Sequence, residues 1–307
     1  MTLLLHTRLH QVKACIELLR PVQWLKNVFV LAPLFFGSQL LSARHAWPAL
    51  LMFLAFCMLS SSVYCLNDIR DADEDRCHPV KCRRPIASGR VSQGMGYVLM
   101  AVCLMLWMLC TWAAGSSGLW QRLFVVTGVY WLLNLVYCFW LKRYAIVDVV
   151  VIATGFVLRV LAGGLATGIW VSQWLVLMTF LLCTFLALGK RYDDALLAEE
   201  GHASLRRSMV GYNAMFIGLT TSVILAVTMV CYIMYALSDE VAQRMGTPLV
   251  YTTFVWVFCG LLRYMQNMVV RHQSGSPTRT LLHDRFIMLC VVGWMLHFFL
   301  LLYLRVA

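Results

Sequence analysis

Nine apolar runs, each long enough to cross a bilayer as a helix, constrain the fold of this chain more than any other feature of its sequence. They occupy residues 24–42, 48–66, 97–114, 122–141, 147–168, 173–189, 211–237, 249–269 and 286–304. Apolar residues make up 61% of the chain and charged residues 13%, a composition outside the range of soluble globular domains. We therefore predict an all-α integral membrane protein with one transmembrane domain over 1–307, which begins with a short segment at 1–20.

The positions of the positively charged residues predict how the spans are oriented. Of the 25 lysines and arginines, 20 lie on one side, at the N-terminal segment or in and beside the connections at 67–96, 141–146, 190–210 and 270–285. By the positive-inside rule, the N-terminus and these connections are cytoplasmic. An odd number of spans then places the C-terminus outside, so the charge count and the span count agree. Because the net charge of +11 belongs to membrane loops, we expect no nucleic-acid partner.

Acidic and amide residues gather where the second apolar run ends. On a helix, Asn67, Asp68, Asp71 and Asp75 would share an arc of roughly 100°, while Asp73 would point away. Mg²⁺ prefers hard oxygen ligands and commonly bridges a few carboxylates to substrate phosphates. We therefore predict that these four residues form a catalytic site that binds Mg²⁺ and a diphosphate. The alternative is a solvated acidic helix end neutralised by nearby arginines, namely Arg70, Arg76 and Arg84.

A basic, turn-rich stretch follows directly at 78–90. Lys81, Arg83 and Arg84 could bind phosphate oxygens, because arginine forks recognise phosphate through paired hydrogen bonds. The same charges could act only as a topology signal, which needs no particular spacing. A zinc site is disfavoured, because a closed site needs four ligands and only three weak candidates occur: Cys77, His78 and Cys82.

Arg159 lies near the middle of the fifth run, where a charge costs about 2.5–3.5 kcal/mol even on lenient insertion scales. Asp148 shares its helix face but lies roughly 16 Å away along a straight helix, so the two cannot pair directly. We predict that Arg159 meets a substrate phosphate, with an ion pair to an aspartate of another helix as the alternative. Further candidates for phosphate binding lie at the predicted cytoplasmic helix ends: Lys26, Tyr137, Lys142, Arg143, Lys190, Arg191 and Tyr192.

The pattern Asn67-Asp68-x-x-Asp71-x-x-x-Asp75 at the end of a second transmembrane helix resembles the first motif of the UbiA superfamily of membrane prenyltransferases. The resemblance implies a bundle of nine transmembrane helices around a central cavity that opens to the cytoplasmic side and to the bilayer. It also implies Mg²⁺ as cofactor. We expect the protein to be located in the bacterial cytoplasmic membrane.

The second motif of the superfamily is usually another aspartate-rich repeat, but here the corresponding segment is Gly189-Lys190-Arg191-Tyr192-Asp193-Asp194. A basic version of this motif resembles one branch, the decaprenyl-phosphate phosphoribosyltransferases. The chain departs from that branch at Asp193-Asp194, where a neutral residue and a glutamate are more usual. Further segments similar to the branch follow in order within residues 18–290: Arg20–Asn27, Asp75–Gly89, Leu141–Asp148, Gly155–Gly164, Arg263-Tyr264, Ser276-Pro277 and Asp284.

The branch implies transfer of 5-phosphoribose from phosphoribosyl diphosphate (PRPP) to a polyprenyl phosphate of the decaprenyl type, with release of diphosphate. The aspartates would hold Mg²⁺ on the diphosphate, and the basic residues would divide between the 5-phosphate and the lipid phosphate. One alternative is a prenyltransferase that moves a prenyl group to a small aromatic or isoprenoid acceptor, which predicts a second carboxylate pair at 189–194. A transporter is a remote alternative, for which no internal symmetry is seen. The sequence leaves the oligomeric state open, a homo-oligomer included.

Overall fold

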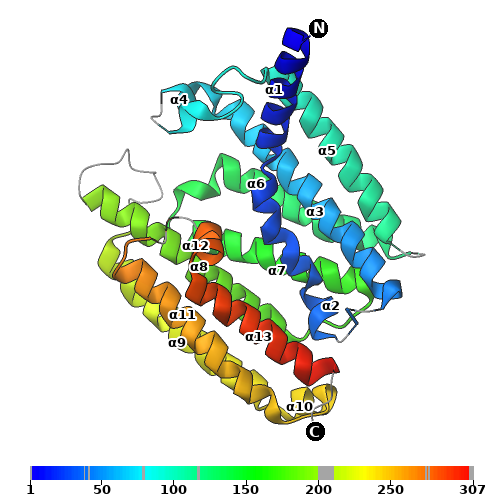
Figure 1. Ribbon diagram of the computed structural model, residues 1–307, viewed down its shortest axis with the longest axis vertical. Coiled ribbons are helices and arrows are strands. Elements are labelled where there is room, and N and C mark those ends of the chain that lie inside the picture. Colours follow the sequence, from blue (N-terminus) through cyan, green and yellow to red (C-terminus); the bar gives the residue numbers. More distant parts are fainter. Residues whose placement is uncertain are drawn as a thin grey trace. The chain divides into compact units, whose positions relative to one another are not determined.

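The structure is a computed structural model that describes residues 2–37, 39–40, 42–77, 80–115, 118–199, 211–273, 275 and 277–303. Every regular element in these described residues is a helix (Figure 1), which confirms the predicted all-α class. The chain divides into two compact units, Met1–Cys138 with Leu158–Trp170 and Phe139–Val157 with Val171–Ala307. The assignment of 1–307 to one domain and the central cavity stay predictions.

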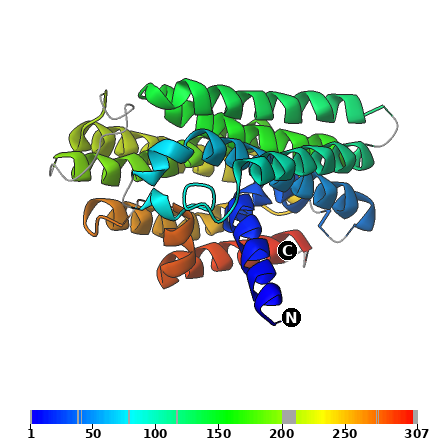
Figure 2. The ribbon, with the colours of Figure 1, turned by 90° about the horizontal axis from the view of Figure 1, so that it is seen from above.

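In the first unit α3 is the central helix. It packs along α5 (Figures 1 and 2) and also contacts α1 and η1, where η denotes a 3-10 helix. Met52, Phe56 and Leu59 of α3 form a buried apolar cluster with Leu123 and Tyr130 of α6. The helices of this unit are α1 (Thr2–Leu19), η1 (Pro21–Leu31), α2 (Ala32–Phe36), α3 (Ala43–Arg70), α4 (Ala72–Arg76), η2 (Lys81–Arg83), α5 (Gln93–Ala114) and α6 (Trp120–Phe139).

In the second unit α8 packs against α9, and α11 packs against α13. Phe185, Leu261, Tyr264 and Ile287 are buried where α8, α11 and α13 meet. α7 (Val147–Thr167) contributes residues to both units. The other helices of this unit are η3 (Leu141–Arg143), α8 (Gln173–Glu199), α9 (Ala214–Ala236), α10 (Asp239–Met245), η5 (Leu249–Thr253), α11 (Phe254–Val269), α12 (Pro277–His283) and α13 (Arg285–Tyr303).

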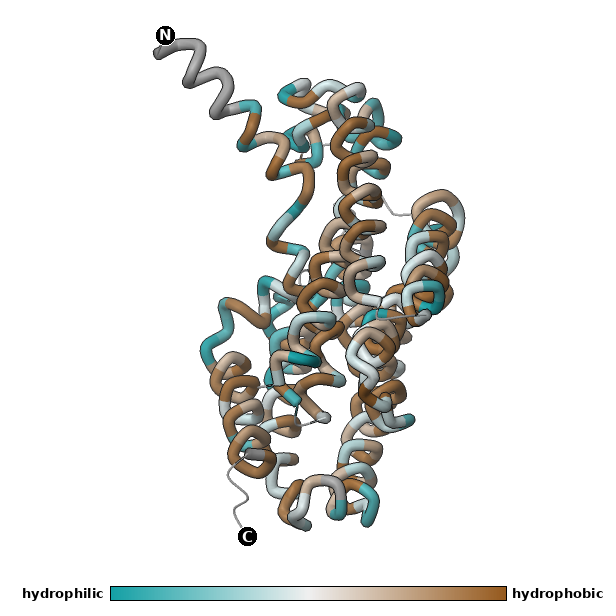
Figure 3. Tube along the Cα trace, turned by 90° about the vertical axis from the view of Figure 1, so that its right-hand side faces the viewer, coloured by the Kyte–Doolittle hydropathy of each residue, from teal (hydrophilic) through white to brown (hydrophobic). Residues whose placement is uncertain are grey.

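Seven helices of the described part of the chain are long and apolar enough to cross a membrane: α3, α5, α6, α7, α8, α9 and α13. They confirm seven of the nine predicted spans. Figure 3 shows that hydrophobic residues recur along the coils of the chain. The chain is therefore a multi-pass membrane protein.

The other two predicted spans, 24–42 and 249–269, are each divided between consecutive shorter helices. The first holds η1 and α2, and the second holds η5 and α11. Pro21 and Pro33 lie in the first turns of η1 and α2, where the missing N–H of proline is tolerated, so each marks a new helix start. In η5 the hydroxyl of Thr253 donates to the carbonyl three residues earlier, which competes with the α-helical ladder. The count of nine spans stays a prediction for these two segments.

The predicted connection at 190–210 is wrong for its first half, because α8 continues through it to Glu199. Strong helix formers follow the polar segment, in the run Ala195-Leu-Leu-Ala198. The buried side chain of Arg191 also ties this end of α8 to α7, as described below. Residues 200–210 lie outside the described residues.

Gly163 of α7 determines how closely η1 approaches this helix in the first unit. A Cβ atom at this position would overlap the backbone carbonyl of Val30, so only glycine fits. Arg159 lies one turn earlier on α7, and Asn27 lies one turn earlier on η1. The close approach therefore brings the side chains of Asn27 and Arg159 within hydrogen-bonding distance.

Candidate active site

The aspartate-rich element lies in the first unit where α3 ends, and a single residue, Asp71, separates α3 from α4. The N–H of Asp71 donates to the carbonyl of Asn67 (2.9 Å), and the N–H of Asp75 donates to the carbonyl of Asp71 (2.8 Å). The predicted helical continuation is thus confirmed, with one break. Asp68 and Asp75 are each 2% exposed, whereas Asn67 and Asp71 are half-buried.

Three basic side chains contact the two buried carboxylates. Arg20 donates to Asp68 Oδ1 (2.6 Å). Arg84 donates to Asp75 Oδ2 (2.6 Å) and also lies 3.4 Å from Asp68 Oδ1, so one guanidinium bridges both carboxylates. Lys81 Nζ lies 3.8 Å from Asp75 Oδ1. Removing carboxylates from water is costly, and this concentration of positive charge offsets the cost.

The remaining charges of the element face outward. The side chain of Asp73 is 86% exposed, as its predicted position on the helix requires, and it pairs with Arg76 at 2.6 Å. Arg70 donates to the carbonyl of Cys138 (2.7 Å). Of the three arginines considered as neutralising partners, Arg84 contacts the buried pair directly.

Arg20 is a site residue that the sequence reasoning missed, because it was used only for orientation and for the family resemblance. Its backbone is left-handed (φ 53°, ψ 60°), a conformation that is uncommon for residues other than glycine. The guanidinium also lies 4.8 Å from the centre of the Tyr64 ring. The signal that could have found it is the pair Arg20-Pro21, which places a charge at the start of η1.

The basic stretch after α4 is tied to α1. Arg90 donates to both carboxylate oxygens of Glu17 (2.6 and 3.1 Å) and to the carbonyl of Arg83 (2.5 Å). The hydrogen bonds from Arg90 hold the pKa of Glu17 below its ordinary value. The side chain of Arg83 itself is exposed on η2, and its role in phosphate binding stays a prediction. His78 and Pro79 lie outside the described residues.

The donor set of the aspartate-rich element fits magnesium by its chemistry. Asp68 Oδ2 is buried and has no hydrogen-bond partner, and a cation is one group that satisfies such an oxygen. In the described residues no three His, Cys, Asp or Glu side chains are grouped to hold a metal ion. Mg²⁺ does not need such a group, because it keeps several waters and binds through one or two carboxylates plus substrate phosphates. Binding of Mg²⁺ by Asn67, Asp68, Asp71 and Asp75 stays a prediction.

Arg159 is 6% exposed, and its neighbours include neutral polar and aromatic groups. It donates from Nε to Asn27 Oδ1 (2.8 Å) and from one terminal nitrogen to the hydroxyl of Tyr130 (2.8 Å). Its guanidinium also lies 4.6 Å from the centre of the Tyr130 ring and 5.7 Å from that of Phe56. An amide, a phenol and two π faces thus lower the cost of burying this charge. Its contact with a substrate phosphate stays a prediction.

A buried ion pair connects α7 and α8 in the second unit. Arg191 Nε donates to Asp148 Oδ2 (2.7 Å), and the two side chains are 3% and 0% exposed. The hydroxyl of Tyr212 donates to Asp148 Oδ1 (3.1 Å) and accepts from the backbone N–H of Ile146 (2.6 Å). Asp194 Oδ2 lies 3.4 Å from Arg191 on its other side.

The other residues predicted to bind phosphate are distributed over both units, and their roles stay predictions. Two belong to the first unit and the rest to the second: Lys26 on η1 and Tyr137 on α6, then Lys142 and Arg143 on η3, and Lys190 and Tyr192 on α8.

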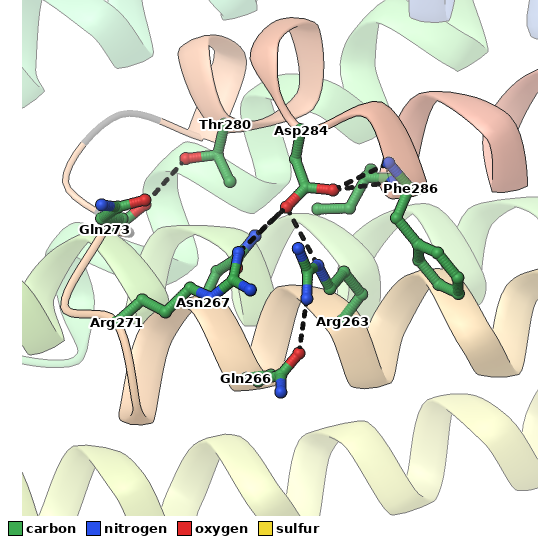
Figure 4. A network of polar contacts seen from close by, with 9 residues as sticks. Arg263, Gln266, Asn267, Arg271, Gln273, Thr280, Asp284 and Phe286 are labelled. Carbon is green, nitrogen blue, oxygen red and sulfur yellow. Dashed lines mark hydrogen bonds and ion pairs between the residues drawn. The ribbon is translucent and has the colours of Figure 1, made fainter.

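A second polar network joins α11 to the start of α13 (Figure 4). Asp284 Oδ2 accepts from Arg263 Nε (3.0 Å) and Asn267 Nδ2 (2.8 Å), and Arg271 lies 3.9 Å away. Asp284 Oδ1 accepts from the N–H groups of the second and third residues of α13 and so caps this helix. Although burial acts to raise it, the pKa of Asp284 lies below its ordinary value because of these hydrogen bonds.

The sequence reasoning singled out Arg263 and Asp284 only as part of the family resemblance, and missed the network itself. The available signal is the recurrence of Arg263, Asn267 and Arg271 every four residues, which places them on one helix face. Ser276, quoted in the same resemblance, lies outside the described residues.

Comparison with known proteins matches residues 30–291 to the UbiA prenyltransferase family. The chain is 33% identical over 293 residues to the decaprenyl-phosphate phosphoribosyltransferase of Mycolicibacterium smegmatis, covering 92% of this chain and 90% of that protein. It is 34% identical over 281 residues to the decaprenyl-phosphate phosphoribosyltransferase of Corynebacterium glutamicum, covering 91% of this chain and 83% of that protein.

Among solved structures, a UbiA homologue from Archaeoglobus fulgidus bound to GPP and Mg²⁺ is similar, with a TM-score of 0.67 over 94% of this chain and 99% of that one. The two sequences are 19% identical, so this likeness concerns the fold.

Proposed function

The chain belongs to the UbiA prenyltransferase family, and from this premise we propose that it transfers 5-phosphoribose from PRPP to a polyprenyl phosphate of the decaprenyl type, releasing diphosphate. The observation that carries the proposal is its similarity, over at least 91% of its length, to two bacterial decaprenyl-phosphate phosphoribosyltransferases. The basic segment Lys190-Arg191, in place of a second aspartate-rich repeat, supports the same branch.

The proposal includes a location and an orientation. Both relatives are bacterial proteins, and a polyprenyl phosphate is a membrane lipid, so we assign the chain to the bacterial cytoplasmic membrane. The excess of lysine and arginine on one side of the spans supports a cytoplasmic N-terminus and an external C-terminus.

In the proposed site the aspartate-rich element binds the diphosphate end of PRPP. Asn67, Asp68, Asp71 and Asp75 would hold Mg²⁺, which when bound neutralises charge that develops on the leaving diphosphate. Arg20, Lys81 and Arg84 add positive charge beside the carboxylates, through their contacts with Asp68 and Asp75. A diphosphate needs both a metal and hydrogen-bond donors, and this element offers oxygen ligands and cationic donors together.

The reaction needs positioning and charge stabilisation more than covalent help from the protein. The bond between C1 of the ribose and the diphosphate oxygen breaks, and its electron pair leaves with diphosphate. An oxygen of the lipid phosphate forms the new bond to C1. Because this oxygen is already ionised at neutral pH, no general base has to remove a proton. The contribution of the basic side chains is therefore electrostatic, and it is largest where charge develops on the leaving group.

The direct test mixes the purified protein with Mg²⁺, PRPP labelled in the ribose, and a polyprenyl phosphate. We expect the label to enter the lipid fraction, to stop doing so when a chelator removes the metal, and to resume when Mg²⁺ is restored. If the protein instead transfers a prenyl group from prenyl diphosphate to an aromatic acceptor and leaves PRPP intact, the proposal is wrong and the conventional prenyltransferase activity replaces it.

Substitution within the aspartate-rich element tests the site with a matched control. Asp75→Asn removes a buried charge that contacts Arg84 and Lys81, and we expect a loss of transfer on the order of 10²–10³-fold, as for other groups that stabilise developing charge. Asp73→Asn makes the same chemical change on the exposed side of α4 and should stay close to wild type. Equal losses in the two variants would contradict the assignment, provided that both proteins remain folded by thermal unfolding.

A further inference from the structure

A basic pocket lies between α11, α12 and α13 in the second unit, and none of its residues is used by the proposed reaction. Its volume is about 950 Å³, within the size range of small-molecule sites. Four arginines line it, one from α11, one just after α11, one from α12 and one at the first position of α13: Arg263, Arg271, Arg279 and Arg285.

The pocket has an excess of positive charge. Among the described residues that line it, Asp284 is the one carboxylate, and its two oxygens are engaged by Arg263, Asn267 and the start of α13. Asp193 of α8 lies at the edge of the pocket, next to the lining residue Gly275. Its Oδ2 atom would lie 3.3 Å from a Cβ atom added at Gly275. Even with both aspartates ionised, four arginines leave the pocket positive. An anion is therefore the complementary ligand.

The α13 N-terminus does not supply the anion site, because Asp284 already accepts from its free N–H groups. Arg271, Arg279 and Arg285 are all exposed, so their guanidinium groups are accessible to a ligand. Guanidinium groups favour phosphate over smaller anions, because their planar forks match its oxygen geometry.

Asn267 helps to hold the carboxylate of the pocket in place. It is 2% exposed and lines the pocket, and its Nδ2 donates to Asp284. Because Asp284 also accepts from Arg263 and caps α13, the exposed arginines are the charged groups that a ligand in the pocket can contact.

We propose that this pocket binds a phosphate ester, whose phosphate is bound by Arg271, Arg279 and Arg285. Two sources carry this chemistry, a soluble sugar phosphate and the headgroup of a lipid such as phosphatidylglycerol. Both can reach the pocket, because the membrane-spanning part of α13 begins at Arg285. The inference goes beyond the transfer reaction and does not depend on it.

The test measures binding to the full chain in detergent by isothermal titration calorimetry, with a chelator present so that metal-dependent donor binding is absent. We expect glycerol 3-phosphate, a phosphate ester that is not part of PRPP, to bind. Arg279→Gln and Arg285→Gln should each weaken glycerol 3-phosphate binding about tenfold or more, as expected for a charge-assisted hydrogen bond. Arg122→Gln, which removes an exposed arginine on α6, should leave the affinity unchanged.

Two results would overturn the proposal. One is an affinity for glycerol 3-phosphate that is unchanged in the double variant Arg279→Gln/Arg285→Gln. The other is an absence of measurable glycerol 3-phosphate binding to the wild-type protein. Because glycerol 3-phosphate is not a fragment of PRPP, failure of the proposed transfer reaction and failure of the pocket are distinguishable.

A second measurement identifies the source of the ligand. The protein is placed in nanodiscs of phosphatidylcholine with or without phosphatidylglycerol, and the titration with glycerol 3-phosphate is repeated. A weaker apparent affinity in the presence of phosphatidylglycerol, lost in the double variant, supports the pocket with a lipid headgroup as its ligand. An unchanged affinity that is still abolished by the double variant supports the pocket with a soluble phosphate as its ligand.

Discussion

The buried pair of Asp148 and Arg191 offers the sharpest test of what the basic second motif does. Asp148→Asn keeps the size of the side chain and removes its charge, which leaves a guanidinium that is 3% exposed without its closest carboxylate. Breaking a buried ion pair from one side costs about 3–5 kcal/mol. Because Asp194 remains 3.4 Å from Arg191, we expect the lower end, a decrease of about 3 kcal/mol in the free energy of unfolding.

The double variant Asp148→Asn/Arg191→Gln should recover most of this loss. Two neutral amides can hydrogen-bond to each other, and no buried charge is left uncompensated. A double-mutant cycle then gives a favourable coupling energy between the two positions.

The assay is thermal unfolding of the purified protein in detergent, followed by tryptophan fluorescence. A loss of about 3 kcal/mol corresponds to a decrease in Tm on the order of 5–10 °C for a chain of this size. Asp73→Asn serves as the control, because its carboxylate is 86% exposed and its pair with Arg76 should add little to stability.

One combination of results would refute this reasoning. If Asp148→Asn unfolds like wild type while Arg191→Gln abolishes transfer without loss of stability, Arg191 serves the substrate and not the pair. The prediction from the sequence that Arg191 binds phosphate would then be correct.

Three further predictions use the same unfolding assay. Gly163→Ala should lower Tm, because the new methyl group overlaps a backbone carbonyl of η1. Gly128→Ala, with open space around its Cβ position, should leave Tm unchanged or raise it. Equal effects of the two substitutions would contradict the close approach of η1 to α7. Tyr130→Phe removes the hydroxyl that accepts from the buried arginine of α7 and should cost about 1.5–3 kcal/mol, while Tyr251→Phe at an exposed site should cost little. The pKa of Asp284 is lower in the folded protein than in the unfolded chain, so this carboxylate stabilises the fold above the unfolded pKa of about 3.9, and the stabilisation is lost as pH falls through the folded pKa. Acidification from pH 6 to 3 should therefore lower Tm more in wild type than in Asp284→Asn. Parallel curves of Tm against pH for the two proteins would refute this.

The local pattern of apolar and charged residues in the sequence was enough to predict the helices and the aspartate-rich element. Hydrophobic runs longer than a bilayer core can only be helices in lipid, because their backbone groups must be satisfied within the segment. The spacing of Asp68, Asp71 and Asp75 likewise predicted their arrangement on a helix, because helix geometry repeats every 3.6 residues. The sequence pattern did not predict that the backbone changes from a 3-10 helix to an α-helix within 24–42 and within 249–269, because apolar residues continue through the change in both segments.

Which charges meet was decided only by the tertiary structure. Asp68 is paired with Arg20, 48 residues away, and Arg159 bonds to Asn27, 132 residues away. The sequence gives the number of charges and their approximate depth, but the energy of a pair depends on the distance between its atoms and on the water that packing excludes. The sequence therefore determined that Arg159 and the aspartates need partners, and the packing of distant helices determined which groups those partners are.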